Sequence, residues 1–127
     1  MKYEEIKIGQ SARYSKWITP SIVEDYISLC GDNNPVHTQR ARPIVHGMLV
    51  MAFISTLIGK EIPGDGALWV SSNVKFLVPI RVWDKIVIIG TVHSKNDNNK
   101  TLKLHIDVFN ENDDICVSCT AIVKATE

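Results

Sequence analysis

The hydrophobic pattern near the start of the chain predicts a short strand followed by a helix. Between Thr19 and Gly31, apolar residues recur at the spacing of one helix face. Thr19 is a favourable N-cap, Pro20 suits the first helical position, and Gly31 can adopt the left-handed conformation that ends many helices. Residues 11–18 have the weaker pattern of a strand. We therefore expect a strand over 11–18 and a helix that begins after Thr19.

A second helix is predicted over Met48–Ile58, where the residues are apolar on nearly every side. A helix of this kind is normally covered by the rest of the protein. The run is too short to cross a membrane, which takes about 20 apolar residues. We predict a buried central helix that ends at Gly59.

After residues 63–66 the hydrophobic period changes to that of strands. Alternating apolar positions indicate strands around 74–80, 102–108 and 115–123. The β-branched run Ile86–Val92 is typical of a strand buried on both faces. Turn-forming residues stand between the later strands. This order predicts an α+β fold in which an antiparallel sheet, with helices on one face, curls about the central helix.

Composition narrows the class of protein. The 127 residues suit one domain, and no linker, repeat or low-complexity tract divides them. Basic and acidic residues both number 14, whereas general binders of nucleic acid or anionic membranes need a basic excess. The N-terminal residues carry no signal-peptide pattern. We expect a single domain over residues 1–127, in the cytoplasm, with no nucleic-acid or membrane partner.

The three cysteines, Cys30, Cys116 and Cys119, are expected to be free thiols in a reducing compartment. Cys116 and Cys119 form a C-x-x-C motif without a second pair. On a strand, residues three apart face opposite sides, so these thiols do not converge on one ion. We therefore expect no zinc site from the cysteines.

A carboxylate and an imidazole stand five residues apart in the loop after the first helix, at Asp32 and His37. Pro35 and the preceding Asn34 restrict the backbone between them. The two side chains could hold one water molecule, with the carboxylate accepting a proton and the imidazole giving or taking another, as hydration requires. In the alternative interpretation, Asp32 only binds backbone N–H groups in a turn and His37 is a surface residue.

The start of the central helix is a second candidate feature. Unpaired N–H groups and the helix dipole favour negative charge there, and Gly47 lets a substrate approach the backbone. Gly47 could equally serve only a tight helix entry. His46 could wall a site or cap the helix, and the cap is favoured. Ser55 could simply bond the backbone of the preceding turn. A metal site from Asp32, His37 and His46 is conceivable but has no recognised spacing, so no metal is expected.

Taken together, the stretches Tyr26–His37 (YISLCGDNNPVH) and Pro43–Leu49 (PIVHGML) resemble the MaoC-like dehydratase family, best known for (R)-specific 2-enoyl-CoA hydratases. Val74–Asp84 resembles the family's strand after the central helix. The resemblance implies a hot-dog fold, an antiparallel β-sheet wrapped around a central buried α-helix. It also implies at least a homodimer, with a continuous sheet and active sites near the subunit interface.

The resemblance assigns roles to single residues. Asp32 and His37 become the catalytic acid/base pair, and Gly47 offers its N–H to a thioester carbonyl. Asn34, His46 and Ser55 are grouped as residues that support or line the substrate site. Between His37 and His46 this chain is shorter than the family pattern, in a stretch that normally helps to wall the site.

The predicted activity is reversible hydration of a trans-2-enoyl thioester to an (R)-3-hydroxyacyl thioester, in metabolism of the fatty-acid type. No cofactor is needed, because the thioester itself acidifies C2. Coenzyme A or an acyl-carrier arm is the handle of the substrate. Three alternatives stay open: a hot-dog thioesterase, a non-catalytic acyl-CoA binder, and a subunit that needs a partner chain. The candidate phosphate contacts are Arg40, Arg42, Lys75 and Arg81.

Overall fold

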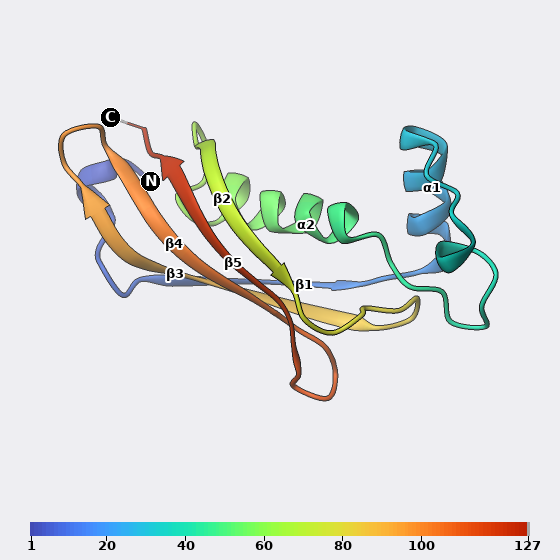
Figure 1. Ribbon diagram of the computed structural model, residues 1–127. Coiled ribbons are helices and arrows are strands. Elements are labelled where there is room, and N and C mark those ends of the chain that lie inside the picture. The colour runs from blue at the N-terminus through green and yellow to red at the C-terminus, as the bar shows by residue number, and fades with distance from the viewer. Residues whose placement is uncertain (127) are drawn as a thin grey trace.

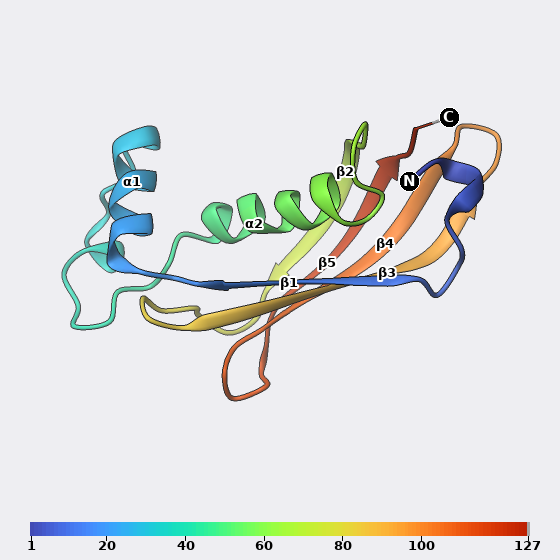
Figure 2. The ribbon, with the colours of Figure 1, turned by 180° about the vertical axis from the view of Figure 1, so that it is seen from behind.

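The computed structural model describes residues 1–126, which form a curved antiparallel sheet with one long helix along its concave side (Figures 1 and 2). The helices are α1 (Pro20–Cys30) and α2 (Gly47–Lys60). Short 3-10 turns cover Tyr3–Glu5 and Pro35–His37. The strands are β1 (Ser11–Trp17), β2 (Leu68–Phe76), β3 (Lys85–Asn96), β4 (Thr101–Phe109) and β5 (Ile115–Lys124). The predicted α+β hot-dog fold is confirmed.

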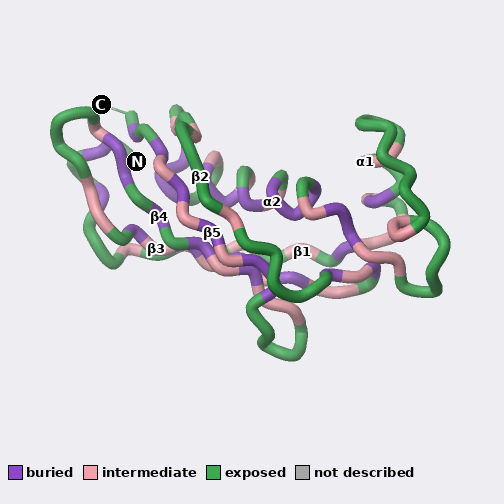
Figure 3. The backbone as a smooth tube through the Cα atoms, viewed as in Figure 1, coloured by how far each residue is buried: buried purple, intermediate pink, exposed green. Residues whose placement is uncertain are grey.

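The strand order, within the part of the chain that the structure describes, is β1-β3-β4-β5-β2, and every neighbouring pair is antiparallel. The turn predicted after β3 joins β3 to β4, and the turn predicted after β4 joins β4 to β5, so that each forms a hairpin. β2 pairs with β5, so the chain leaves the sheet after β2 and returns at β3. β2 therefore lies at one edge of the sheet, and Figure 3 shows it as largely exposed.

The first elements form for the reasons that the sequence indicates. The Thr19 Oγ1 atom accepts a hydrogen bond from the N–H of Ile22 at the start of α1. Gly31 ends the helix with φ 84°. In Figure 1, α1 stands beyond one end of α2, and the chain between them carries four of the predicted site residues, Asp32, Asn34, His37 and His46. These caps thus set where that loop begins.

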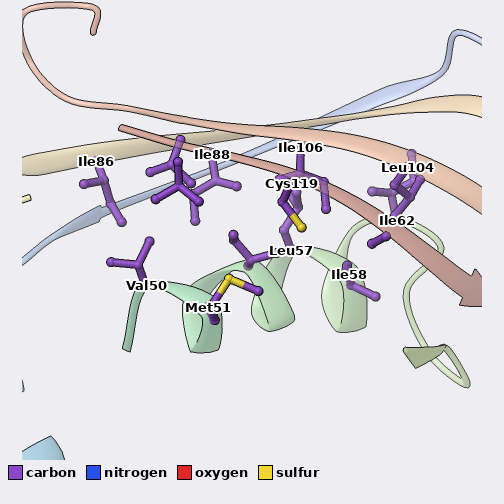
Figure 4. Packing of buried hydrophobic residues seen from close by; sticks show 14 of the residues in the cluster. Val50, Met51, Leu57, Ile58, Ile62, Ile86, Ile88, Leu104, Ile106 and Cys119 are labelled. Carbon is purple, nitrogen blue, oxygen red and sulfur yellow. The ribbon is translucent and has the colours of Figure 1, made fainter. Parts of the chain in front are cut away.

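The hydrophobic core lies between α2 and the concave face of the sheet (Figure 4). Burying a large aliphatic side chain fully contributes about 1.5–3 kcal/mol. Gly90 in β3 makes room for the helix, because a Cβ atom there would lie 2.8 Å from Leu57 Cδ2. The buried residues of α2 are Leu49, Val50, Met51, Ile54, Leu57 and Ile58, and those opposite include Ile86, Ile88, Leu104, Ile106 and Cys119.

Two predictions about α2 are wrong. The helix does not end at Gly59 but continues to Lys60, because the N–H of Glu61 still bonds the carbonyl of Leu57. Nor is it covered on all sides. Met48 is 64% exposed, and Ala52 and Ser55 continue an exposed stripe at helical spacing. The cover that its apolar sequence demands is thus not complete within residues 1–126.

Two strand predictions also need correction. The run Ile86–Val92 is buried on one face only, because alternate residues turn to the outer side of the sheet and are half-buried. The strand predicted over 74–80 ends at Phe76. Beyond it the chain turns to meet the segment before α2, where the N–H of Val45 bonds the carbonyl of Ile80. No helix in the described residues is long and apolar enough to span a membrane.

The three cysteines give a test of this packing. Cys30 is exposed, whereas Cys116 and Cys119 are buried. Burial raises the pKa of the Cys119 thiol to about 11 and also raises that of Cys116. Since the thiolate is the reactive form, a disulfide reagent at mildly alkaline pH should label Cys30 alone in the native protein. In guanidinium chloride all three should react. Rapid native labelling of all three would contradict the burial of β5.

Candidate active site

Local hydrogen bonds shape the loop that carries Asp32 and His37. The N–H of Asn34 donates to Asp32 Oδ1 at 3.2 Å, and the N–H of Val36 donates to Asn34 Oδ1 at 3.1 Å. Bonds of this kind, from side chains to nearby backbone, stabilise turns. They bend the chain into the 3-10 turn Pro35–His37. As a result, His37 Nε2 lies 3.8 Å from Asp32 Oδ2.

The structure therefore combines the two sequence interpretations of Asp32. One carboxylate oxygen bonds the backbone of the turn, and the other faces His37. The Asp32 side chain is 54% exposed, whereas that of His37 is 13% exposed. His37 is thus not the surface residue of the alternative interpretation. The predicted pair is brought together, with the carboxylate on the open side.

The second ring nitrogen of His37 fixes the tautomer. Nδ1 lies 2.6 Å from the main-chain carbonyl oxygen of Ile44. A carbonyl only accepts hydrogen bonds, so Nδ1 carries the proton and donates it. In the neutral ring, Nε2 is then the unprotonated nitrogen, and it faces Asp32. The imidazole is held so that Nε2 is the atom available for proton transfer.

The Ile44 carbonyl is itself held in place by a segment that is far away in the sequence. Ile44 pairs with Arg81 as an antiparallel bridge, and the N–H of Val45 bonds the carbonyl of Ile80 at 2.7 Å. Beside this bridge, Arg42 Nη2 donates to Asp84 Oδ1 at 2.5 Å. The short segment between His37 and His46 is thereby tied to the connection between β2 and β3.

Two of the four candidate phosphate contacts are engaged in this region. Arg42 pairs with Asp84, and Arg81 Nη1 donates to the Arg42 carbonyl at 3.1 Å. Arg40 and Lys75 are exposed. Phosphate binding by Arg42 or Arg81 would compete with these internal bonds, so the structure favours Arg40 and Lys75 for that role.

His46 does not cap α2. It occupies the N-cap position, but its side chain makes no capping bond. Instead, Nε2 lies 2.8 Å from the Asp32 carbonyl oxygen, and the ring stacks on His37 with centroids 3.7 Å apart. The cap interpretation is therefore wrong. His46 packs against His37 and lines neither the cavity that opens beside His37 nor the groove that contains Ser55.

The same stacking bears on a metal site. Asp32, His37 and His46 each offer one ligand atom, and these atoms lie within 4.8 Å of one another. However, the two imidazole planes are only 20° from parallel. Because a nitrogen lone pair lies in the ring plane, stacked rings cannot both direct one at an ion about 2.0–2.1 Å away. The absence of a metal cofactor stays a prediction, and this geometry supports it.

An apolar cavity of about 560 Å³ opens beside His37. Its wall is built from the start of α2 and from the segment that follows β2. A mostly apolar cavity with one polar reactive group is typical of a site for a small organic ligand. Besides His37, the lining includes Ile44, Gly47, Met48, Phe76, Leu77 and Ile80.

Gly47 faces this cavity as the first residue of α2. Its N–H has no acceptor within the helix, and the positive end of the helix dipole lies there. A Cβ atom at this position would lie 2.7 Å from Phe76 Cε1. The glycine thus serves close packing, as one interpretation held, while its N–H remains available to a ligand, as the other requires.

Ser55 is not close to the Asp32–His37 pair. It lies two turns further along α2, in an open groove of about 450 Å³ with Trp69 and Ser71. Met48 lines both this groove and the cavity beside His37, so the two are adjacent. The expected bond to the preceding turn is made by Thr56, whose Oγ1 donates to the Ala52 carbonyl. Ser55 is left facing the groove.

Sequence reasoning missed two parts of the site. The acceptor for His37 is a main-chain carbonyl, which any residue at position 44 would supply. The cavity wall at 76–80 continues the alternation of a strand, although β2 ends at Phe76 and Ile80 bonds Val45 instead. Interruption of the alternation by Pro79 was the one available indication.

The comparison with known families agrees with this geometry. The family model described as "MaoC like domain" matches residues 4–112. This chain belongs to the MaoC-like dehydratase family. The Aeromonas caviae protein named (R)-specific enoyl-CoA hydratase is 30% identical over 132 positions, with 98% of each chain covered. The Rhodospirillum rubrum protein of the same name is 37% identical over 98 positions, with coverage of 71% of this chain and 68% of that one.

A solved structure is similar over nearly the whole fold. R-Hydratase PhaJ1 from Pseudomonas aeruginosa superposes with a TM-score of 0.93 at 29% identity, covering 99% of this chain and 86% of the other. The alignment with the Aeromonas protein has 132 positions, more than the 127 residues of this chain. That relative therefore has residues that this chain lacks. Their location between His37 and His46 stays a prediction.

The turn that carries His37 can be tested through Asn34. Replacing Asn34 with Ala removes the acceptor for the Val36 N–H, and a lost cap of this kind costs about 1 kcal/mol. Asn34→Asp keeps an acceptor and should be close to wild type. Chemical denaturation measures the difference in the free energy of unfolding. Asn33→Ala, one residue earlier, is the control. Equal effects at positions 33 and 34 would refute the assigned cap.

Proposed function

We propose that this chain catalyses the reversible addition of water to a 2-enoyl thioester, giving a 3-hydroxyacyl thioester. The observation that carries the proposal is the placement of His37 Nε2, 3.8 Å from the Asp32 carboxylate and beside an apolar cavity. The family relatives at 30% and 37% identity, both named (R)-specific enoyl-CoA hydratase, support this reaction and its stereochemistry.

Asp32 and His37 can together move the two protons that hydration transfers, one away from the water and one onto C2. In the hydrating direction, Asp32 begins as a carboxylate and His37 as an imidazolium, with Nδ1–H on Ile44 and Nε2–H toward the substrate. The water oxygen bonds C3 while one water proton passes to Asp32. The electrons of the C2=C3 bond move toward C2, which takes the Nε2 proton. The new bonds are C3–O and C2–H.

The pair must then return to its starting state. After the reaction Asp32 is protonated and His37 is neutral. The proton passes from Asp32 to Nε2 across their 3.8 Å separation, through a small side-chain rotation or one bridging water. The Ile44 carbonyl holds Nδ1–H throughout, so only Nε2 exchanges protons. Dehydration is the same sequence in reverse.

The start of α2 stabilises the charge that develops on the thioester. As C3 is attacked, negative charge spreads from C2 to the thioester oxygen. The Gly47 N–H and the positive end of the helix dipole favour an oxygen with this charge. Because the thioester accepts the electrons, no redox cofactor is needed. Coenzyme A or an acyl-carrier arm carries the acyl group, and Arg40 and Lys75 are the proposed phosphate contacts.

We further propose that the protein is a homodimer in which β2 of one copy lies against the other. β2 is an edge strand, and such an edge offers unpaired N–H and C=O groups to another strand. Two exposed residues in its first half are apolar: Leu68 is 64% and Val70 61% exposed. The uncovered stripe of α2 lies beside it in the groove with Ser55. A second copy would complete the cover of α2.

The decisive experiment for the activity is loss of enoyl-thioester absorbance with crotonyl-CoA. Wild type should turn over, and Asp32→Asn and His37→Ala should each fall by about 10²–10⁴ in rate, as expected for loss of an acid/base group. His105→Ala, which removes an exposed imidazole on β4, is the control and should retain full activity. A dehydrogenase specific for (R)-3-hydroxyacyl-CoA identifies the product.

The outcomes separate the other activities open to a hot-dog protein. Release of free coenzyme A without hydration would indicate a thioesterase. Binding without turnover, unchanged in Asp32→Asn, would indicate an acyl-CoA binder. Activity only in the presence of a cell extract would indicate a missing partner chain. Any of these results would contradict the proposed hydratase.

The proposed dimer is tested by Val70→Lys. A charge on the edge strand should prevent pairing, because burying an unpaired ammonium group is costly. Sedimentation should give twice the chain mass of 14.2 kDa for wild type and the single mass for the variant. Ile8→Lys, which changes a residue that is 66% exposed elsewhere, should remain dimeric. A monomeric wild type, or a dimeric Val70→Lys, would exclude this interface.

A further inference from the structure

His46 is an imidazole next to the site that takes no part in the proposed chemistry. It is 3% exposed and lines neither cavity. Its Nδ1 atom is buried and has no hydrogen-bond partner among the described residues. A buried polar atom without a partner costs about 1–3 kcal/mol. A histidine at this position therefore needs a compensating role, since an apolar residue of similar size would avoid that cost.

The other ring nitrogen of His46 binds the main chain of Asp32. His46 Nε2 lies 2.8 Å from the Asp32 carbonyl oxygen, which can only accept, so Nε2 carries the proton. Asp32 belongs to an exposed loop, whereas His46 lies directly before the packed helix α2. The bond thus ties the main chain of Asp32 to the start of a helix that packs on the core.

The ring of His46 also packs against two neighbouring aromatic rings. One face stacks on His37, with centroids 3.7 Å apart and planes at 20°. The edge-on ring of Tyr26 packs against His46 with centroids 4.8 Å apart. His37 is then held at its edge by the Ile44 carbonyl and on its face by His46. His46 is in contact with both members of the pair.

We propose that His46 is a positioning residue, whose Nε2–H bond to Asp32 and stacking on His37 together set the separation of the carboxylate and the imidazole. The role rests on the proposed hydratase function. Because His46 does not reach the cavity, its loss should lower kcat and leave KM nearly unchanged. A misplacement of about 1 Å in such a pair can cost on the order of 10²-fold in rate.

Two amide variants separate the tether from general packing. In His46→Gln the side-chain amide nitrogen can reach the position of Nε2 and keep the bond to Asp32. In His46→Asn the amide reaches only the position of Nδ1, so the bond is lost. Asn is a preferred N-cap, which should preserve α2 and keep this variant folded. Thermal unfolding of both variants checks that they are folded.

The measurement is steady-state hydration of crotonyl-CoA. His46→Asn should lose about 10–100-fold in kcat with KM within about twofold, whereas His46→Gln should stay within about fivefold of the wild-type kcat. Thr101→Val is the control for loss of a buried polar group, because Thr101 is 9% exposed and bonds Asn99 at a distance from the site. It should lower the melting temperature and leave kcat unchanged.

The outcomes distinguish this inference from the activity on which it depends. An inactive wild type overturns the proposed function and the positioning role together. An active wild type with equal kcat in the Gln and Asn variants, or with a change in KM instead, overturns the positioning role alone. Nitrogen-15 NMR of wild type is a readout independent of activity. It should find the His46 proton on Nε2, and a proton on Nδ1 instead would overturn the proposed tether.

Discussion

The hydrogen bond from His37 Nδ1 to the Ile44 carbonyl is the contact on which the organisation of the site depends. It joins the loop after α1 to the segment before α2, and that segment is joined in turn to the connection between β2 and β3. Through this bond the ring tautomer is set by the fold. The ring nitrogen Nε2 is thereby presented to the Asp32 carboxylate by a main-chain hydrogen bond at the opposite side of the ring.

The helix α2 has two functions that impose different demands on its sequence. Its packed side must fill the curve of the sheet, which explains the large aliphatic residues and the glycine opposite Leu57 in β3. Its first residue, Gly47, must leave the backbone accessible while Phe76 packs against it. The same helix therefore supports the core and presents its positive end to the cavity.

The uncovered side of α2 connects folding with assembly. The helix was expected to be enclosed because almost all its residues are apolar, yet Met48 and its neighbours along one stripe are exposed. Edge strand β2 exposes apolar side chains next to the same groove. This apolar surface, divided between a helix and an unpaired strand edge, is the reason for the proposed homodimer.

Much of the fold was present in the local sequence. The first helix is fixed by Thr19, Pro20 and Gly31, whose effects act over one helical turn. The alternating runs at 102–108 and 115–123 define strands, and this pattern is also local in the sequence. The residue pair Asp32–His37 could also be predicted, since the turn between them is made by neighbouring side chains.

Only the tertiary structure decided the other features of the fold and the site. The chain leaves the sheet after Phe76 and meets the segment before α2, where the N–H of Val45 bonds the carbonyl of Ile80. His46 became a buried partner of the Asp32–His37 pair because packing brought these two residues and Tyr26 around it. Such contacts join residues far apart in the chain, and no local pattern encodes them.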